Sequence, residues 1–231
     1  MLKKSLIRRF KSAGEPLVLL AVLAVLLLVP RKIVGDHTRL IWRGELTTAS
    51  LAELQNLIEK HPHQYNVIQF RNSPGASAAA GIIIEQVETL INLHHLDTEV
   101  RGACSSACAS SFLLGETRTM LPGLRREPTY LMLHATRQFK TREVDYSHTE
   151  KIFRKIAARS EGQFPMVLLE SIFDDRKGTA DGELYVFREA RPSIAGPQHV
   201  FICRNAVMAV IDTCEPVVGI KPQDLGIHVG T

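Results

Sequence analysis

The sequence has no internal repeat and no low-complexity tract, and it carries one tryptophan in 231 residues. The missing repeat argues against a solenoid or propeller, and the missing low-complexity tract argues against a fibrous or disordered chain. Hydrophobic residues make up 45% and charged residues 23% of the chain, which is the composition of a globular protein. The length is sufficient for one sizeable domain with a well-buried core.

Outside the N-terminus the sequence lacks any excess of positive charge. The formal net charge is +4, from 28 basic and 24 acidic residues. Residues 1–32 contain seven of the basic residues and one acidic residue, which leaves 21 against 23 and a net charge of −2 for the rest. A nucleic-acid-binding domain would need a basic surface, so we expect no nucleic-acid partner.

The N-terminus has the pattern of a membrane-targeting element that lacks a cleavage site. A basic stretch, MLKKSLIRRFK, precedes thirteen uncharged apolar residues, LVLLAVLAVLLLV, and then PRK. The apolar core has the length of a signal-peptide h-region, but no A-x-A-like site follows it. We therefore expect residues 1–15 to be a basic cytoplasmic end and residues 16–34 an uncleaved single-pass anchor, with a cleaved signal or a buried core helix as alternatives. The positive charge before the apolar run places the rest of the chain outside the cytoplasm, on the periplasmic side of the inner membrane.

The cysteines lack the spacings of the common redox and zinc sites. There are four, and neither a C-x-x-C motif nor two tight ligand pairs is present, so no thioredoxin-like site, metal or cofactor is expected. An even number of cysteines suits an oxidising compartment. Cys203 and Cys214 flank a short apolar segment and are expected to form a disulfide, with two buried thiols as the alternative. Cys104 and Cys108 are either a local disulfide or small buried residues.

Short apolar runs alternate with segments of helical periodicity along the chain. Strands are expected within residues 38–47, 65–70, 97–102 and 130–136, and helices within 50–62, 78–95, 107–114, 146–160 and 165–173. Ser50 is expected to cap the first helix, with Glu53 as its capping-box partner. This alternation predicts an α/β domain with a mostly parallel sheet.

Three polar features follow three of these strands. They are NSPGAS at residues 72–77, CSSAC at 104–108, and His134. The carboxyl ends of parallel strands meet at one edge of a sheet, where binding sites collect. The sequence therefore predicts a functional site at this edge.

Serine and histidine at such an edge suit nucleophilic catalysis, although the G-x-S-x-G motif is absent. Ser105 or Ser106 would lie at a strand-to-helix junction, with helix N-terminal amides beside the hydroxyl. His134 is the best-placed base, and the Pro-Gly turn at 74–75 would offer amides to an oxyanion. Each of these features also has an ordinary structural role as a cap, a turn or a strand end.

Three motifs in the same order resemble the Clp protease proteolytic subunit of the ClpP/crotonase superfamily and its extracytoplasmic relatives. They are FRNSPGASAAAGIIIEQVETL, VRGACSSACASSFLLGETRTM and YLMLHAT. The resemblance covers about residues 38–190 of an expected domain at 36–231. It implies repeated units of two strands and a helix around the sheet. The remaining C-terminal tail, which contains Cys203 and Cys214, has no counterpart in that family.

The resemblance also implies roles for individual residues. Ser106 matches the family nucleophile, His134 the general base, and the amides of Ala76 and Ala107 the oxyanion site. Asp181 is the nearest match for the acid of the triad, with Asp174, Asp175 and Glu183 as alternatives. Ala76 replaces a glycine of the family motif, which would cost about 1–2 kcal/mol if a positive φ were needed there.

Two functions follow as expectations. The first is a membrane-anchored, outward-facing serine peptidase acting on peptides or proteins, with self-association as a further expectation. The second is an inactive binding or scaffolding protein on the same fold. A Ser-Lys mechanism is the alternative within the enzyme class, with Lys140, Lys151 and Lys155 as the lysines to consider.

Overall fold

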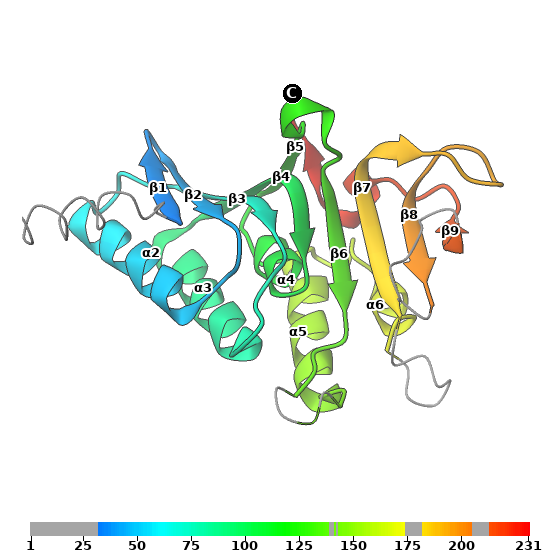
Figure 1. The fold of residues 1–231 in the computed structure, drawn as a ribbon, viewed down its shortest axis with the longest axis horizontal. Coiled ribbons are helices and arrows are strands. Elements are labelled where there is room, and N and C mark those ends of the chain that lie inside the picture. The colour runs from blue at the N-terminus through cyan, green and yellow to red at the C-terminus, as the bar shows by residue number, and fades with distance from the viewer. Residues whose placement is uncertain (1–31, 139–140, 142, 174–181, 205–212) are drawn as a thin grey trace, which may run out of the picture. The chain divides into compact units, whose positions relative to one another are not determined.

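Parallel strands form the centre of the sheet, and antiparallel strands extend it at both edges (Figure 1). The computed structural model describes residues 32–231, except 139–140, 142, 174–181 and 205–212. The main path runs β1-β2-β3-β4-β6-β7-β8-β9, and β5 and β10 form a branch from β4. The strands are β1 (Ile33–Asp36), β2 (Arg39–Arg43), β3 (Val67–Ser73), β4 (Asp97–Ser105), β5 (Arg118–Leu121), β6 (Tyr130–His134), β7 (Glu183–Arg191), β8 (Gln198–Cys203), β9 (Glu215–Val217) and β10 (His228–Val229).

The helices lie along one side of this sheet and contact one another in chain order (Figure 1). They are α2 (Thr48–Lys60), α3 (Ala80–His94), α4 (Ala107–Leu113), α5 (Tyr146–Arg159) and α6 (Met166–Glu170), with 3-10 turns η1 (Leu124–Arg126) and η4 (Pro222–Leu225). The predicted α/β class with parallel strands is confirmed, but the sheet is mixed. Two strands and a helix repeat in β1-β2-α2 and β5-β6-α5, whereas α3 and α4 each follow a single strand.

The start of α2 differs from the expectation. Thr47 is the N-cap, and its hydroxyl accepts the Ser50 amide at 3.1 Å while the Ser50 hydroxyl accepts the Thr47 amide at 2.9 Å. Ser50 is therefore the third residue of the helix and the partner in the box, and the prediction that it caps the helix is wrong. Serine can replace the expected glutamate because its hydroxyl reaches back to the same amide.

The core lies between the sheet and the helices. Trp42, Phe70 and Val100, on neighbouring strands, are fully buried, and Ile33 at the start of β1 is 1% exposed. Ile33 and Val34 thus belong to the folded domain, although the sequence suggested that they end the membrane anchor. Residues 16–31 of that anchor lie outside the described residues, and no described helix is long and apolar enough to cross a membrane.

Strand β4 changes its neighbour at Gly102, and this change determines where the site forms. Residues before Gly102 pair with β5, and residues after it pair with β6. Gly102 has φ +83°, and an added Cβ would lie 1.9 Å from Asn72 Oδ1, so only glycine fits. Asn72 Oδ1 in turn accepts the Ala103 amide at 3.0 Å. The second half of β4 is thereby directed along β6, toward His134.

Candidate functional site

Ser106 lies at the junction of β4 and α4 in a backbone conformation that serine rarely adopts. Its φ is 56° and its ψ is −123°. Its amide donates to the Met132 carbonyl on β6 at 2.7 Å, and its carbonyl accepts the Ser110 amide at 3.1 Å. Left-handed conformations of non-glycine residues cost of order 1–3 kcal/mol and concentrate at functional sites. The chain therefore makes a sharp, fixed turn at this serine.

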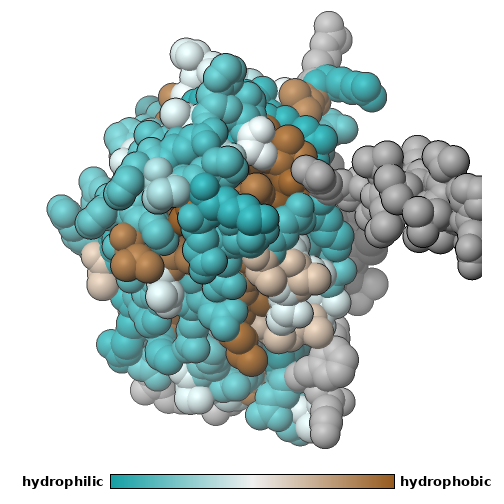
Figure 2. Space-filling model, turned by 90° about the vertical axis from the view of Figure 1, so that its left-hand side faces the viewer, coloured by the Kyte–Doolittle hydropathy of each residue, from teal (hydrophilic) through white to brown (hydrophobic). Residues whose placement is uncertain are grey.

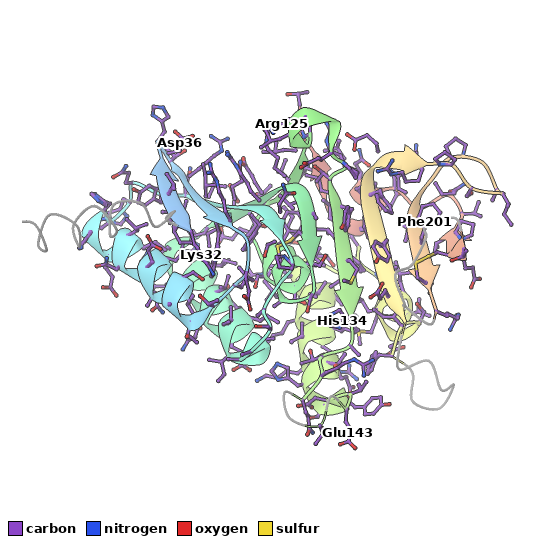
Figure 3. All side chains as sticks on the ribbon, viewed as in Figure 1. Lys32, Asp36, Arg125, His134, Glu143 and Phe201 are labelled. Atoms are coloured by element: carbon purple, nitrogen blue, oxygen red, sulfur yellow. A yellow bond between two sulfur atoms is a disulfide. The ribbon has the colours of Figure 1, made fainter. Side chains whose placement is uncertain are left out.

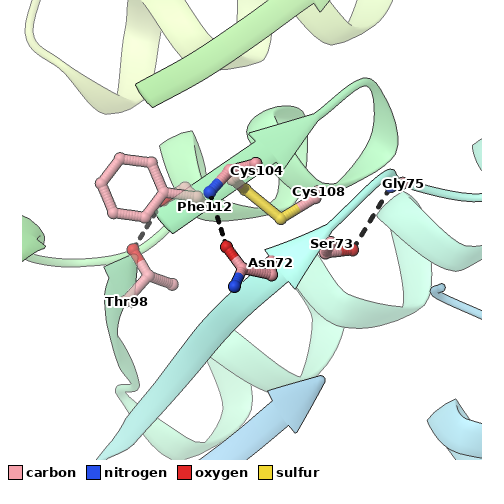
Figure 4. The surroundings of a disulfide bond; sticks show 8 residues. Asn72, Ser73, Gly75, Thr98, Cys104, Cys108 and Phe112 are labelled. Atoms are coloured by element: carbon pink, nitrogen blue, oxygen red, sulfur yellow. Dashed lines mark hydrogen bonds between the residues drawn. A yellow bond between two sulfur atoms is a disulfide. The ribbon is translucent and has the colours of Figure 1, made fainter. Parts of the chain in front are cut away.

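A disulfide encloses the turn. Cys104 and Cys108 are bonded, their Cα atoms lie 5.3 Å apart, and both are fully buried (Figure 4). The bond joins the last part of β4 to the first turn of α4, so it spans Ser106 on both sides. The second cysteine pair, Cys203 and Cys214, is also bonded. The expected disulfide between Cys203 and Cys214 is therefore confirmed, and of the two alternatives for Cys104 and Cys108 the local disulfide is the one present.

The turn after β3 lies directly against Ser106. Gly75 has φ +93°, and a Cβ added there would lie 2.9 Å from Ser106 Cβ and 3.0 Å from the Ala107 nitrogen. The Gly75 carbonyl accepts the Leu46 amide at 2.8 Å. Ala76 is not among the residues with positive φ, so its replacement of glycine brings no backbone strain. The conformational freedom is needed at Gly75, where the sequence has it.

An acidic side chain holds the far end of this turn. Glu45 Oε1 accepts the Ser77 amide at 3.0 Å and also the Ser77 hydroxyl. These hydrogen bonds from Ser77 lower the pKa of the Glu45 carboxyl from its usual range. The amides of Ala76 and Ala107 donate to no other group among the described residues and lie at the same pocket.

His134 ends β6 with a defined tautomer. Its Nδ1 lies 2.7 Å from the Ala135 carbonyl oxygen. A carbonyl oxygen only accepts, so Nδ1 carries the proton in the neutral ring and Nε2 keeps its lone pair. That is the protonation state a general base needs. The main chain itself therefore orients this imidazole.

Ser106 and His134 line one pocket of about 320 Å³, together with Ala76, Ala107 and Arg137. Ser105 instead lines a separate pocket of about 460 Å³ beside Tyr130. No hydrogen bond joins the Ser106 hydroxyl to His134 in the described structure. The two serines of the motif thus face different spaces, and only Ser106 shares one with the histidine.

The acid of the expected triad is not covered by the described residues. Asp181, and the alternatives Asp174 and Asp175, lie outside the described residues. Glu183 is described and stands directly opposite His134 in the β6–β7 pair. Its carboxylate accepts the Tyr185 hydroxyl at 2.8 Å. Asp181 therefore stays a prediction.

Two of the three lysines considered for a Ser-Lys mechanism are held in ion pairs away from Ser106. Lys151 Nζ lies 2.6 Å from Glu85, and Lys155 pairs with Glu88, both between α5 and α3. The hydrogen bond that Lys151 donates to the Glu85 carboxylate raises the pKa of Lys151, whereas a lysine base needs a lowered pKa. Lys140 lies outside the described residues.

Several pocket residues were missed in the sequence. Met132, Thr136 and Arg137 line the pocket because they flank His134, and Ser110 lies one helical turn after Ser106. The even spacing of Met132 and His134 along one strand was the available signal, since alternate residues of a strand share a face. Nothing in the sequence pattern singled out Arg137.

No family model and no curated protein matches the sequence. Among solved structures, the ClpP protease catalytic domain from Plasmodium falciparum matches with 17% identity and a TM-score of 0.44, over 65% of this chain and 76% of that one. A ClpP1 mutant from Listeria monocytogenes matches with 17% identity and a TM-score of 0.46, over 62% and 87%. The chain is thus similar to these two ClpP structures, and the chemistry has to be argued from the site itself.

Proposed function

We propose that this chain is a serine peptidase in which Ser106 is the nucleophile and His134 the general base. One observation carries the proposal. Ser106, at a turn with a positive φ, lines the same pocket as His134. Nδ1 of that imidazole donates a hydrogen bond to the Ala135 carbonyl, which leaves Nε2 to accept a proton. Serine is a weak nucleophile alone, and a base with a free Nε2 supplies the activation it lacks.

The proposed reaction follows the usual two stages of acyl transfer. His134 Nε2 takes the hydroxyl proton as Ser106 Oγ attacks a peptide carbonyl, and the Ala76 and Ala107 amides bind the resulting oxyanion. The imidazolium then returns the proton to the leaving amine as the C–N bond breaks. Water, deprotonated by the same imidazole, then attacks the acyl carbon; the ester bond to Ser106 Oγ breaks, Oγ takes the proton back from the imidazolium, and the second product leaves as a carboxylic acid. Asp181 is the proposed third member of the triad, and in that role its carboxylate would replace the Ala135 carbonyl as the acceptor of the Nδ1 proton.

The location is part of the same proposal. The basic and apolar N-terminal sequence supports a single-pass anchor in the inner membrane, with the folded domain outside the cytoplasm. The two disulfides support an oxidising compartment, because disulfides are rare in reducing cytosol. The substrate would then be an extracytoplasmic peptide or protein, and self-association of the chain stays a prediction.

One observation favours the second candidate, an inactive binding protein. Ser106 and His134 are not hydrogen-bonded to each other, whereas a resting nucleophile and its base often are. In such a protein the pocket would hold a peptide without cleaving it.

A fluorophosphonate probe on the full-length protein in neutral detergent separates the two candidates. We expect covalent labelling of the wild type, and none of Ser106→Ala. His134→Ala should react at least about 100-fold more slowly, since general-base assistance contributes that much or more. Ser105→Ala is the matched control, because Ser105 faces the other pocket, and it should react like the wild type. Absence of wild-type labelling between pH 6 and 9, or equal labelling of Ser106→Ala, would favour the binding protein.

A further inference from the structure

Three arginines stand side by side on the sheet, away from the pocket. Arg43 on β2 is in register with Arg71 on β3, which is in register with Arg101 on β4. Residues in register project from the same face of a sheet, and neighbouring strands lie about 4.8 Å apart. The residues just before them, Trp42, Phe70 and Val100, are buried against the helices. The three arginines therefore project from the opposite face, away from the helices that the structure describes.

Lys32 continues this row by one strand. The Arg43 amide donates to the Lys32 carbonyl at 2.9 Å, and Ile33 is in register with Trp42. Lys32 consequently lies opposite Arg43. We call these four residues the cationic row, which spans about 14 Å across four strands. Figure 3 shows Lys32 near the β1 edge and His134 at the end of β6, and none of the four residues of the row lines the pocket that contains Ser106.

A neighbouring arginine on the same face shows what the row lacks. Arg39 binds Glu99 through two hydrogen bonds of 2.9 and 3.1 Å, and Glu99 also accepts from Gln69 at 2.6 Å. In the described part of the chain, no carboxylate forms an ion pair with Arg43, Arg71 or Arg101. The acceptor that would suit the row is already fully used by Arg39.

The polar groups of the row are also poorly satisfied. Arg101 Nε is buried and has no hydrogen-bond partner, while Arg71 Nε donates to Gln69. Burial, and then the charges of Arg43 and Arg101, lower the pKa of Arg71, and only Asp36 and Glu99 act in the opposite direction. Like charges placed directly opposite each other on adjacent strands are destabilising. The arrangement therefore costs stability unless an anion neutralises it.

We propose that the cationic row binds phosphate groups, and that these belong to the headgroups of anionic phospholipids. Guanidinium groups bind phosphate oxygens in pairs, which gives the row both its chemistry and its geometry. A straight row of basic residues fits several phosphates in one plane better than a single enclosed ion.

The chain itself favours the lipid source. Lys32 falls within residues 16–34, the segment expected to anchor the protein, and it directly precedes β1, so the row begins where the expected anchor meets the folded domain. Figure 2 shows that the surface on the side of β1 and α2 is mainly hydrophilic, with only small separate hydrophobic areas. Attraction to headgroups, rather than insertion of apolar side chains, would then hold the domain against a membrane. The proposal does not depend on peptidase activity.

The test is a lipid titration of the full-length protein in neutral detergent, followed by thermal unfolding. Phosphatidylglycerol is added in one arm, phosphatidylcholine in the second and inorganic phosphate in the third. Arg71→Gln/Arg101→Gln breaks the row. Lys60→Gln/Arg154→Gln is the matched control, since it removes two positive charges from the exposed surfaces of α2 and α5 and leaves the N-terminal segment unchanged.

We expect phosphatidylglycerol, and not phosphatidylcholine, to raise the unfolding temperature of the wild type and the control. The row variant should need about 10-fold more phosphatidylglycerol for the same increase in unfolding temperature, because each basic residue near an anionic membrane surface contributes to the free energy of binding. Equal responses of the row variant and the control would overturn the proposal. A full response to inorganic phosphate that the row variant loses would keep the phosphate site but overturn the lipid source.

Discussion

Both disulfides close short loops, but the two loops lie in very different parts of the structure. Cys104 and Cys108 are four residues apart and fully buried around Ser106. Cys203 and Cys214 are eleven residues apart and join the end of β8 to the start of β9, the edge strand of the path. Loop entropy alone would assign about 2 kcal/mol to the first and about 3 kcal/mol to the second.

By loop length, the bond between Cys203 and Cys214 should stabilise the fold more. By its position around Ser106, the bond between Cys104 and Cys108 should matter more for the nucleophile. The longer loop constrains the unfolded chain more, but neither of its cysteines lines the pocket, and Cys203 lies two strands from His134 in the register of the sheet. The shorter loop constrains the native chain at the one residue whose φ and ψ place the hydroxyl. A disulfide so close to a nucleophile acts by limiting how far the turn can relax, and this effect is separate from overall stability.

Gly75→Ala should have the largest effect on Ser106, because it disturbs the turn at this residue while both disulfides stay intact. It therefore separates the position of the nucleophile from the stabilisation that the disulfides provide. The added Cβ would lie 2.6 Å from the Ser105 carbonyl oxygen and 2.9 Å from Ser106 Cβ, so the two loops must separate. A shift of about 1 Å in a catalytic group costs about 100-fold in rate. We expect that decrease in the rate of fluorophosphonate labelling.

Gly196→Ala is the matched control for Gly75→Ala. Gly196 has φ +84°, but nothing lies within 4 Å of an added Cβ. It therefore has the same cost of a left-handed alanine, about 1–2 kcal/mol, without the contacts at the turn. Equal labelling of the two variants would show that the contacts at Gly75 do not position Ser106.

Removal of the buried disulfide should have the next largest effect. In Cys104→Ala/Cys108→Ala the turn keeps its hydrogen bonds to Met132 and Ser110 but loses its covalent closure. We expect labelling to slow about 10-fold, which corresponds to about 1.4 kcal/mol of lost positioning. Labelling at the wild-type rate in a folded variant would contradict a positioning role for this bond.

Helices and strands with a clear local hydrophobic pattern could be predicted from the sequence. Five helices and the strands carrying Phe70, Arg101 and His134 follow from periodicity and apolar runs. Strand β5 did not, because it is short and pairs with β4 only where Gly102 divides that strand. Strands β7, β8 and β9 were missed because their pairing is between distant segments, and a local pattern does not record the partner.

The site was predicted in part for the same reason. Ser106 and His134 follow strands whose carboxyl ends meet, so their proximity could be inferred. The role of Ala135 could not, since the tautomer of His134 depends on a backbone carbonyl rather than on a side chain. The cationic row had a signal that was overlooked: RLIWR, VIQFR and TEVR each place an arginine directly after a buried apolar residue.

Glu45→Gln tests the hydrogen bonds between Glu45 and Ser77, which hold the turn after β3 that lies against Ser106. Hydrogen bonds from Ser77 lower the pKa of Glu45, so its contribution to stability is complete above the unfolded-state pKa and is lost as the pH falls through the folded-state pKa. A neutral amide accepts these bonds less strongly, and we expect labelling at pH 7 to slow about twofold. The difference in unfolding temperature between the wild type and the variant should be largest at pH 7 and should decrease steadily as the pH is lowered below the usual range of a glutamate pKa. A difference that does not decrease on acidification would mean that the carboxylate charge is not the cause.

Cys203→Ala/Cys214→Ala should leave the pocket unchanged, and it is the prediction on which the comparison most depends. The bond lies at the β8–β9 edge, whereas Ser106 is fixed by Met132, Ser110 and the other disulfide. We expect the free energy of unfolding to fall by about 3 kcal/mol while labelling stays at the wild-type rate. Denaturant unfolding and labelling of the same preparation measure both quantities. If labelling falls in proportion to stability in both double variants, the two disulfides act alike through the unfolded state, and the buried bond has no separate effect on the nucleophile.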